Sequence, residues 1–142
     1  MGTELLLGDI LNTNAQYLSR ALSELGIAVY NQQVVGDNRE RLAQAVSMAK
    51  ERSDIVILSG GLGPTDDDLT KQTVAQIYND ELVHNQEVED KIRRHFEKMN
   101  RTMTDNNKKQ AYVPKRGKFL PNDNGTAPGI MFIDGEKLAV LP

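Results

Sequence analysis

Residues 54–70 constrain the fold more than any other stretch, because an apolar run, a glycine cluster and an acidic run follow one another there. The apolar run is residues 55–58, and an amphipathic pattern begins after the acidic residues. The glycines and aspartates are Gly60, Gly61, Gly63, Asp66, Asp67 and Asp68. This order predicts a buried strand, a glycine-rich turn and the start of a helix.

Such a turn has consequences for ligand binding. It exposes backbone N–H groups beside a helix N-terminus, where an anion is stabilised. Carboxylates lie there as well, and an anionic ligand tolerates them only with a metal ion or a proton between. A polyphosphate bound with a divalent cation meets both conditions. The alternative is a tight turn whose aspartates cap the helix. Pro64 and Thr65, directly after the glycines, favour the ligand site, although the pattern is neither a P-loop nor a dinucleotide fingerprint.

Three carboxylates are candidate metal ligands. Mg²⁺ characteristically takes one or two carboxylates together with phosphate oxygens. Asp68 stands where the helix should begin and is the first candidate, and Asp67 is the second. Asp37 follows a predicted strand, at the edge where ligands bind in open α/β sheets. A helix cap explains Asp37 equally well. Glu4 and Asn14 could read a base or a ribose, but they are also ordinary loop and cap residues.

The remaining patterns predict alternating helices and strands. Residues 12–26 predict a helix capped by Asn12 or Thr13 and ended by Gly26, and residues 27–35 predict a strand. A helix from Asn38 and the strand at 55–58 follow. This alternation is typical of a parallel sheet with covered faces.

The second half of the chain continues this organisation. Two helical patterns follow Thr70, residues 98–109 predict a loop with a short helix, and residues 113–120 predict extended chain. Apolar runs at 130–133 and 137–141 flank Asp134-Gly135, a strong hairpin signal. We therefore expect a mixed sheet with an antiparallel edge.

Composition narrows the class of protein. The chain has 142 residues, which suits one domain, and its 17 basic against 20 acidic side chains argue against a grip on bulk nucleic acid. It has no cysteine, which excludes disulfides and thiolate metal sites. No apolar stretch approaches the roughly 20 residues that span a bilayer, and no secretory signal opens the chain. We expect a cytoplasmic protein with neither nucleic acid nor membrane as partner.

Several motifs together resemble the N-terminal domain of the CinA (competence- and damage-inducible) family, within the MoaB/MogA-like molybdopterin-binding superfamily. The resemblance covers nearly the whole chain, with the motifs in the expected order. They are residues 2–8, Asn12-Thr13-Asn14, 34–38, 60–70, 107–111 and 121–129.

This resemblance implies a fold and an activity. The fold would be a three-layer α/β/α sandwich around a mostly parallel sheet, in one domain over residues 1–142. The family has a strand before residue 2, and after residue 142 a glycine-rich turn, a helix and an amidase domain, so the domain is expected to be trimmed at both ends. The implied activity is a metal-dependent ADP-ribose pyrophosphatase that uses Mg²⁺, Mn²⁺ or Co²⁺. The alternatives are a molybdopterin-binding, adenylyl-transferring domain, or a silent nucleotide-binding module. A homo-oligomer is expected, with an adenine nucleotide or a pterin as ligand.

Motif matches also imply site residues. Asp68 and Asp37 match acids of the family, Lys109 and Gln110 match a basic motif that could meet phosphate, and Asp67 is a further metal candidate. Asp68, Asp37 and Lys109 are expected to be catalytic. The expected ligand-binding residues are Glu4, Asn14, Gly60, Gly61, Gly63, Thr65, Asn107, Gly125 and Thr126.

Overall fold

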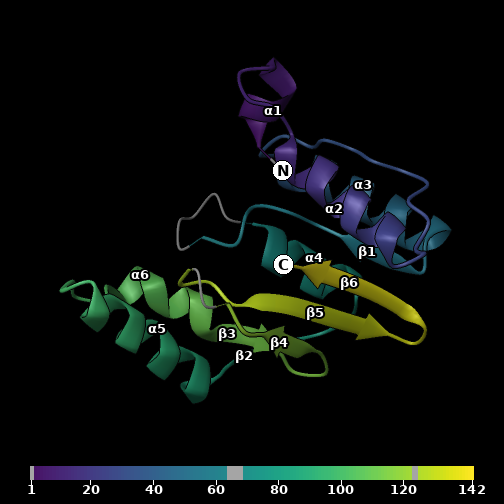
Figure 1. Cartoon of the computed structure of the whole chain (residues 1–142). Helices are drawn as coiled ribbons and strands as arrows, with labels where there is room; N and C mark the ends of the chain where they lie inside the picture. The colour runs from purple at the N-terminus through teal and green to yellow at the C-terminus, as the bar shows by residue number, and fades with distance from the viewer. Residues whose placement is uncertain (1, 64–68, 123–124) are drawn as a thin grey trace.

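The computed structural model describes residues 2–63, 69–122 and 125–142. Its helices are α1 (Thr3–Leu7), α2 (Thr13–Glu24), α3 (Arg39–Arg52), α4 (Thr70–Ile77), α5 (Gln86–Lys98), α6 (Asp105–Lys108) and the 3₁₀ turn η1 (Lys109–Ala111). Its strands are β1 (Ile55–Ile57), β2 (Leu82–His84), β3 (Tyr112–Pro114), β4 (Lys118–Leu120), β5 (Gly129–Asp134) and β6 (Lys137–Leu141). Figure 1 shows α1, α2 and α3 on one side of β5 and β6, with α5 and α6 on the other.

The main sheet has the strand order β1-β6-β5-β4. β1 pairs with β6 in parallel, whereas β5 pairs with β6 and with β4 in antiparallel fashion. β5 and β6 form the predicted hairpin, whose turn places Gly135 at a φ of 61°. β2 and β3 form a separate antiparallel pair. The α/β class and the antiparallel edge are therefore confirmed.

The ends of the helices follow from local sequence. The side chains of Asn12, Asn38 and Asn85 each accept a hydrogen bond from a backbone N–H of the first turn, which is the N-cap geometry. At the end of α2, Gly26 adopts a φ of 75° and its N–H donates to the Ser23 carbonyl. The N–H of Ile27 then donates to the Leu22 carbonyl, which completes a Schellman motif. The predicted caps Asn12, Asn38 and Gly26 are confirmed.

Two apolar clusters hold these elements together. The larger joins α3 and α4 to one face of the main sheet, and its members include Leu42, Val74, Tyr78, Phe132 and Leu141. The smaller joins α5 to η1 and β3. Because the larger cluster involves both the end of β6 and α4, it fixes α4 relative to the sheet.

One expectation for the first part of the chain, the strand at residues 27–35, is wrong. Residues 27–35 are extended but join no strand ladder within the described residues, and Tyr30 is 88% exposed. Its two ends make backbone hydrogen bonds to Leu22 and Gly2, neither of which belongs to a strand. The main sheet consequently has one parallel pairing among the described residues, fewer than the mostly parallel sheet expected. Residues Thr3–Leu7, to which the sequence assigned no element, form α1. No helix in the described ranges is long and apolar enough to cross a membrane.

Candidate functional site

The predicted glycine turn lies at the carboxyl end of β1. Beyond the strand, the N–H of Leu58 still donates to the Val140 carbonyl at 2.9 Å, which carries the pairing with β6 one residue further. Gly60 and Gly61 then adopt φ angles of 102° and 71°. Side chains disfavour this region of φ, so the turn requires glycine at both positions. Gly63 ends the described part of the turn.

Five residues of the motif lie outside the described residues, namely Pro64, Thr65, Asp66, Asp67 and Asp68. The assignment of Thr65 to ligand binding, and of Asp67 and Asp68 to a metal ion, therefore stays a prediction from the sequence.

Helix α4 begins directly beside this turn. The Thr70 hydroxyl donates to the Gly60 carbonyl at 3.3 Å, which ties the first residue of α4 to the turn. The preceding residue, Leu69, has no side chain that could cap the first turn. Backbone N–H groups at such a helix start have no intrahelical acceptor, and they favour an anion.

Asn14 reaches the same turn from α2. Its side-chain amide donates to the Ser59 hydroxyl at 2.9 Å, although the two residues are far apart in sequence. The structure thus places one predicted ligand-binding residue next to Gly60. Ser59 was not singled out in the sequence, where it stands as one polar residue at the end of the apolar run.

Asp37 also lies next to the turn. A cavity of about 10 Å³, close to the volume that one water needs, is lined by residues that include Asp37, Gly61 and Thr70. The Asp37 carboxylate accepts hydrogen bonds from the backbone N–H and the hydroxyl of Thr3, at 3.0 and 2.9 Å. Thr3 is the first residue of α1, so Asp37 caps that helix from a distance. The cap of α3 is Asn38 instead.

Lys71 connects α4 to the basic motif. Its ammonium donates to the carbonyls of Lys109 and Tyr112, at 2.7 and 2.9 Å, and the residue is 7% exposed. Burial lowers the pKa of Lys71 to about 8. Lys71 was missed in the sequence, although it shares a helix face with the buried Val74 and Ala75. A lysine within such an apolar stripe was the available signal.

Within the basic motif, Asn107 and Gln110 are buried, whereas Lys108 and Lys109 are exposed. The Asn107 side chain accepts from the N–H and the hydroxyl of Thr104 at 3.1 and 2.7 Å, which forms a capping box at the start of α6. Gln110 is 3% exposed, and its side-chain oxygen has no hydrogen-bond partner among the described residues. Asn107 therefore has a structural role that its motif match did not predict.

The remaining candidates lie elsewhere. Glu4 is exposed on the first turn of α1. Gly125 and Thr126 lie in a turn before β5 that the Asn122 side chain closes by donating to the Ala127 carbonyl at 2.9 Å. In the described ranges, no hydrogen bond joins these three residues to the glycine turn.

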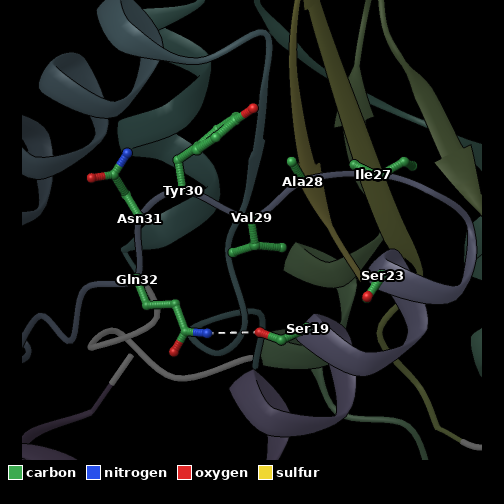
Figure 2. Close-up of a pocket in the computed structure, with 8 residues that line it drawn as sticks. All are labelled: Ser19, Ser23, Ile27, Ala28, Val29, Tyr30, Asn31 and Gln32. Atoms are coloured by element: carbon green, nitrogen blue, oxygen red, sulfur yellow. Dashed lines mark hydrogen bonds between the residues drawn. The ribbon is translucent and has the colours of Figure 1, made fainter.

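A larger hollow lies away from this site. It has a volume of about 330 Å³ and lies between α2 and the extended segment 27–32 (Figure 2). Its lining residues are all uncharged, and the Gln32 side chain donates across it to Ser19 at 2.6 Å. A phosphate bound there would meet no positive charge, so this hollow does not suit an anionic ligand.

The donor set for a metal ion is incomplete within the described ranges. No group of three His, Asp or Glu side chains gathers there closely enough to hold an ion. Asp37 supplies one carboxylate next to the turn, and Mg²⁺ is commonly bound by one or two carboxylates together with phosphate oxygens. Asp37 therefore fits a Mg²⁺ site whose other ligands would come from a bound phosphate.

Comparison with known proteins identifies the family to which the chain is similar. The family described as "Probable molybdopterin binding domain" matches residues 1–142. A CinA-like protein of Dictyoglomus thermophilum is 55% identical over 99% of this chain, and a competence-damage inducible protein of Clostridium acetobutylicum is 50% identical over the same share. The chain spans about a third of the length of these relatives, 34% of each.

A solved structure agrees with this placement. The crystal structure of the protein CinA from Thermoplasma acidophilum matches 99% of this chain and 82% of its own, with 33% identity and a TM-score of 0.86. Likeness at this level extends over the whole arrangement of helices and strands. The chain therefore belongs to the molybdopterin-binding domain family, as a CinA-like member of it.

Proposed function

We propose that this chain is a divalent-metal-dependent nucleotide diphosphate hydrolase, which splits ADP-ribose into AMP and ribose 5-phosphate. The observation that carries the proposal is the convergence of Asn14, Asp37 and Thr70 on the glycine turn at the start of α4. Such a turn offers backbone donors to a diphosphate, and Asp37 offers a carboxylate to an ion bound beside it.

The reaction needs one water and no further reactant. The water oxygen forms a bond to one phosphorus of the diphosphate, and the bond from that phosphorus to the bridging oxygen breaks. The bridging oxygen leaves on the other phosphate, and the proton of the water passes to solvent or to a carboxylate.

The residues of the chain act by holding charge in place. The N–H groups of Gly61 and of the first turn of α4 would bind phosphate oxygens and stabilise the charge that develops on them. Asp37, with Asp67 and Asp68 of the undescribed segment, would hold the divalent ion. A bound ion of this kind polarises phosphate oxygens and lowers the pKa of its water.

Substitution of the carboxylates tests this function. We expect Asp37→Asn and Asp68→Asn each to lower ADP-ribose hydrolysis at least tenfold, measured as AMP release with Mg²⁺, Mn²⁺ or Co²⁺. Asp54→Asn is the matched control, because Asp54 is 92% exposed and lies at the opposite end of β1. Turnover that survives in Asp68→Asn would defeat the assignment.

A second function is favoured by the family description itself, which names molybdopterin binding. A domain of that kind would bind the pterin at the same turn and activate it with an adenine nucleotide. Incubation with molybdopterin and ATP separates the two candidates, since an adenylylated pterin forms only in the second. Nucleotide binding by calorimetry without product in either assay would indicate a silent binding module.

A further inference from the structure

We propose that Lys71 is a positioning residue, which holds the segment 109–112 against the first turn of α4 and so sets the cationic wall of the phosphate site. This inference rests on the proposed function, because it names a part of that same site. It starts from a buried cation that binds two backbone carbonyls and has no counter-charge among the described residues.

The surroundings of Lys71 supply hydrogen bonds but no counter-charge. Its ammonium donates to two backbone carbonyls, and within the described residues no carboxylate lies within ion-pair distance of it. Burying a charge without a partner charge is unfavourable, and an apolar side chain would pack against Val74 and Ala75 without that penalty. The two hydrogen bonds offset part of this cost, and they tie segment 109–112 to α4.

The two carbonyls that Lys71 binds lie on either side of one short turn. Lys109 begins η1 and Tyr112 begins β3, so a single ammonium fixes both ends of that turn relative to α4. The neighbouring Thr70 fixes α4 to Gly60. One continuous chain of contacts thus runs from the glycine turn through α4 to the residue whose side chain is expected to meet phosphate.

The position of the charge agrees with an anionic ligand. Lys71 is in the first turn of α4, where the helix dipole already contributes positive potential and disfavours a cation. An anion at the start of α4 would be stabilised by the helix dipole, and its negative charge would offset the unfavourable placement of Lys71 in the same turn.

The test compares Lys71→Met, Lys71→Arg and the control Lys137→Met. Lys137 also donates to a backbone carbonyl, that of Ser53 at 3.0 Å, but at the far end of β1. We expect Lys71→Met to speed amide hydrogen exchange in residues 109–112 at least tenfold. It should also raise the KM for ADP-ribose and the Kd for inorganic pyrophosphate at least tenfold while kcat changes less than threefold. Lys71→Arg should restore part of the affinity, and Lys137→Met should change none of these quantities.

The arms of the experiment separate this inference from the proposed function. Unchanged exchange in residues 109–112, or faster exchange with unchanged pyrophosphate affinity, would overturn the role of Lys71. The wild-type protein could bind pyrophosphate without hydrolysing ADP-ribose, while Lys71→Met binds pyrophosphate more weakly than the wild type. That result would support the role of Lys71 and refute the proposed function. A wild-type protein that binds neither ADP-ribose nor pyrophosphate would overturn both.

Discussion

Replacing Gly117 by alanine tests whether the close approach of the β3–β4 turn to β5 sets the stability of the sheet. A Cβ atom at this position would overlap the Met131 carbonyl oxygen and would lie 2.8 Å from Cβ of Pro114. The oxygen belongs to the backbone of β5, where Met131 is paired with Lys118. No side-chain rotation relieves such a contact, so the backbone must move.

The size of the effect follows from these contacts. Forcing an extra methyl group into a packed site costs about 1–3 kcal/mol. Loss of one ladder hydrogen bond between β4 and β5 adds about 1 kcal/mol. We therefore expect Gly117→Ala to lower the free energy of unfolding by about 3 kcal/mol. At roughly 3 °C per kcal/mol for a domain near this size, Tm should fall by about 9 °C.

Urea denaturation followed by circular dichroism measures this loss. Gly26→Ala is the matched control, because a Cβ there meets nothing within 4 Å while φ is +75°. The control isolates backbone strain and should cost about 1 kcal/mol. If Gly117→Ala destabilised the protein no more than Gly26→Ala, the reasoning from the Met131 contact would be refuted.

Three further predictions concern stability against pH. The folded pKa of Lys71 is about 8, below its ordinary 10.5, so the unfolded chain holds more protons between these values. Unfolding free energy should rise by up to about 3 kcal/mol from pH 8 to 10.5, and Lys71→Met should lack this rise in urea titrations. Burial and the nearby Asp134 raise the pKa of Tyr78 to about 12. Stability should therefore fall from pH 10 to 12, one tyrosine should ionise late in an ultraviolet titration, and Tyr78→Phe should remove both effects. The hydrogen bond from His84 and that from Arg93 hold the pKa of Glu89 below its ordinary 4.5. The stability that this carboxylate contributes should be lost as pH falls through its folded pKa. In Glu89→Gln, the unfolding free energy should depend less on pH in this acidic range.

Local signals in the sequence predicted much of the fold. Asparagine caps, the glycine turn and the β5–β6 hairpin depend on residues close together in the chain, and all three stand in the structure. The segment 27–35 is an element that local signals predicted wrongly. Its β-branched residues favour extended backbone, which it has, but a strand also requires a neighbour to pair with. Pairing is set by the whole sheet, so propensity alone could not predict it.

The candidate site was likewise predicted from the sequence only in part. The motif order brought Asn14 and Asp37 into consideration, and the structure places both near the glycine turn. Their partners Ser59 and Thr3 could not be read from the sequence, because each pairing joins segments far apart in the chain. Asn107 matched a binding motif but caps α6, since an amide side chain serves either purpose equally well. Residue type alone did not separate those roles.

The most direct test of the central claim is an NMR titration of the ¹⁵N-labelled protein with ADP-ribose and Mg²⁺. The account predicts that the largest shifts of backbone amides fall on Gly60, Gly61, Thr70 and Lys71, because their N–H groups lie where the diphosphate would bind. Shifts confined to the hollow between α2 and segment 27–32, or an absence of shifts at millimolar ligand, would contradict it.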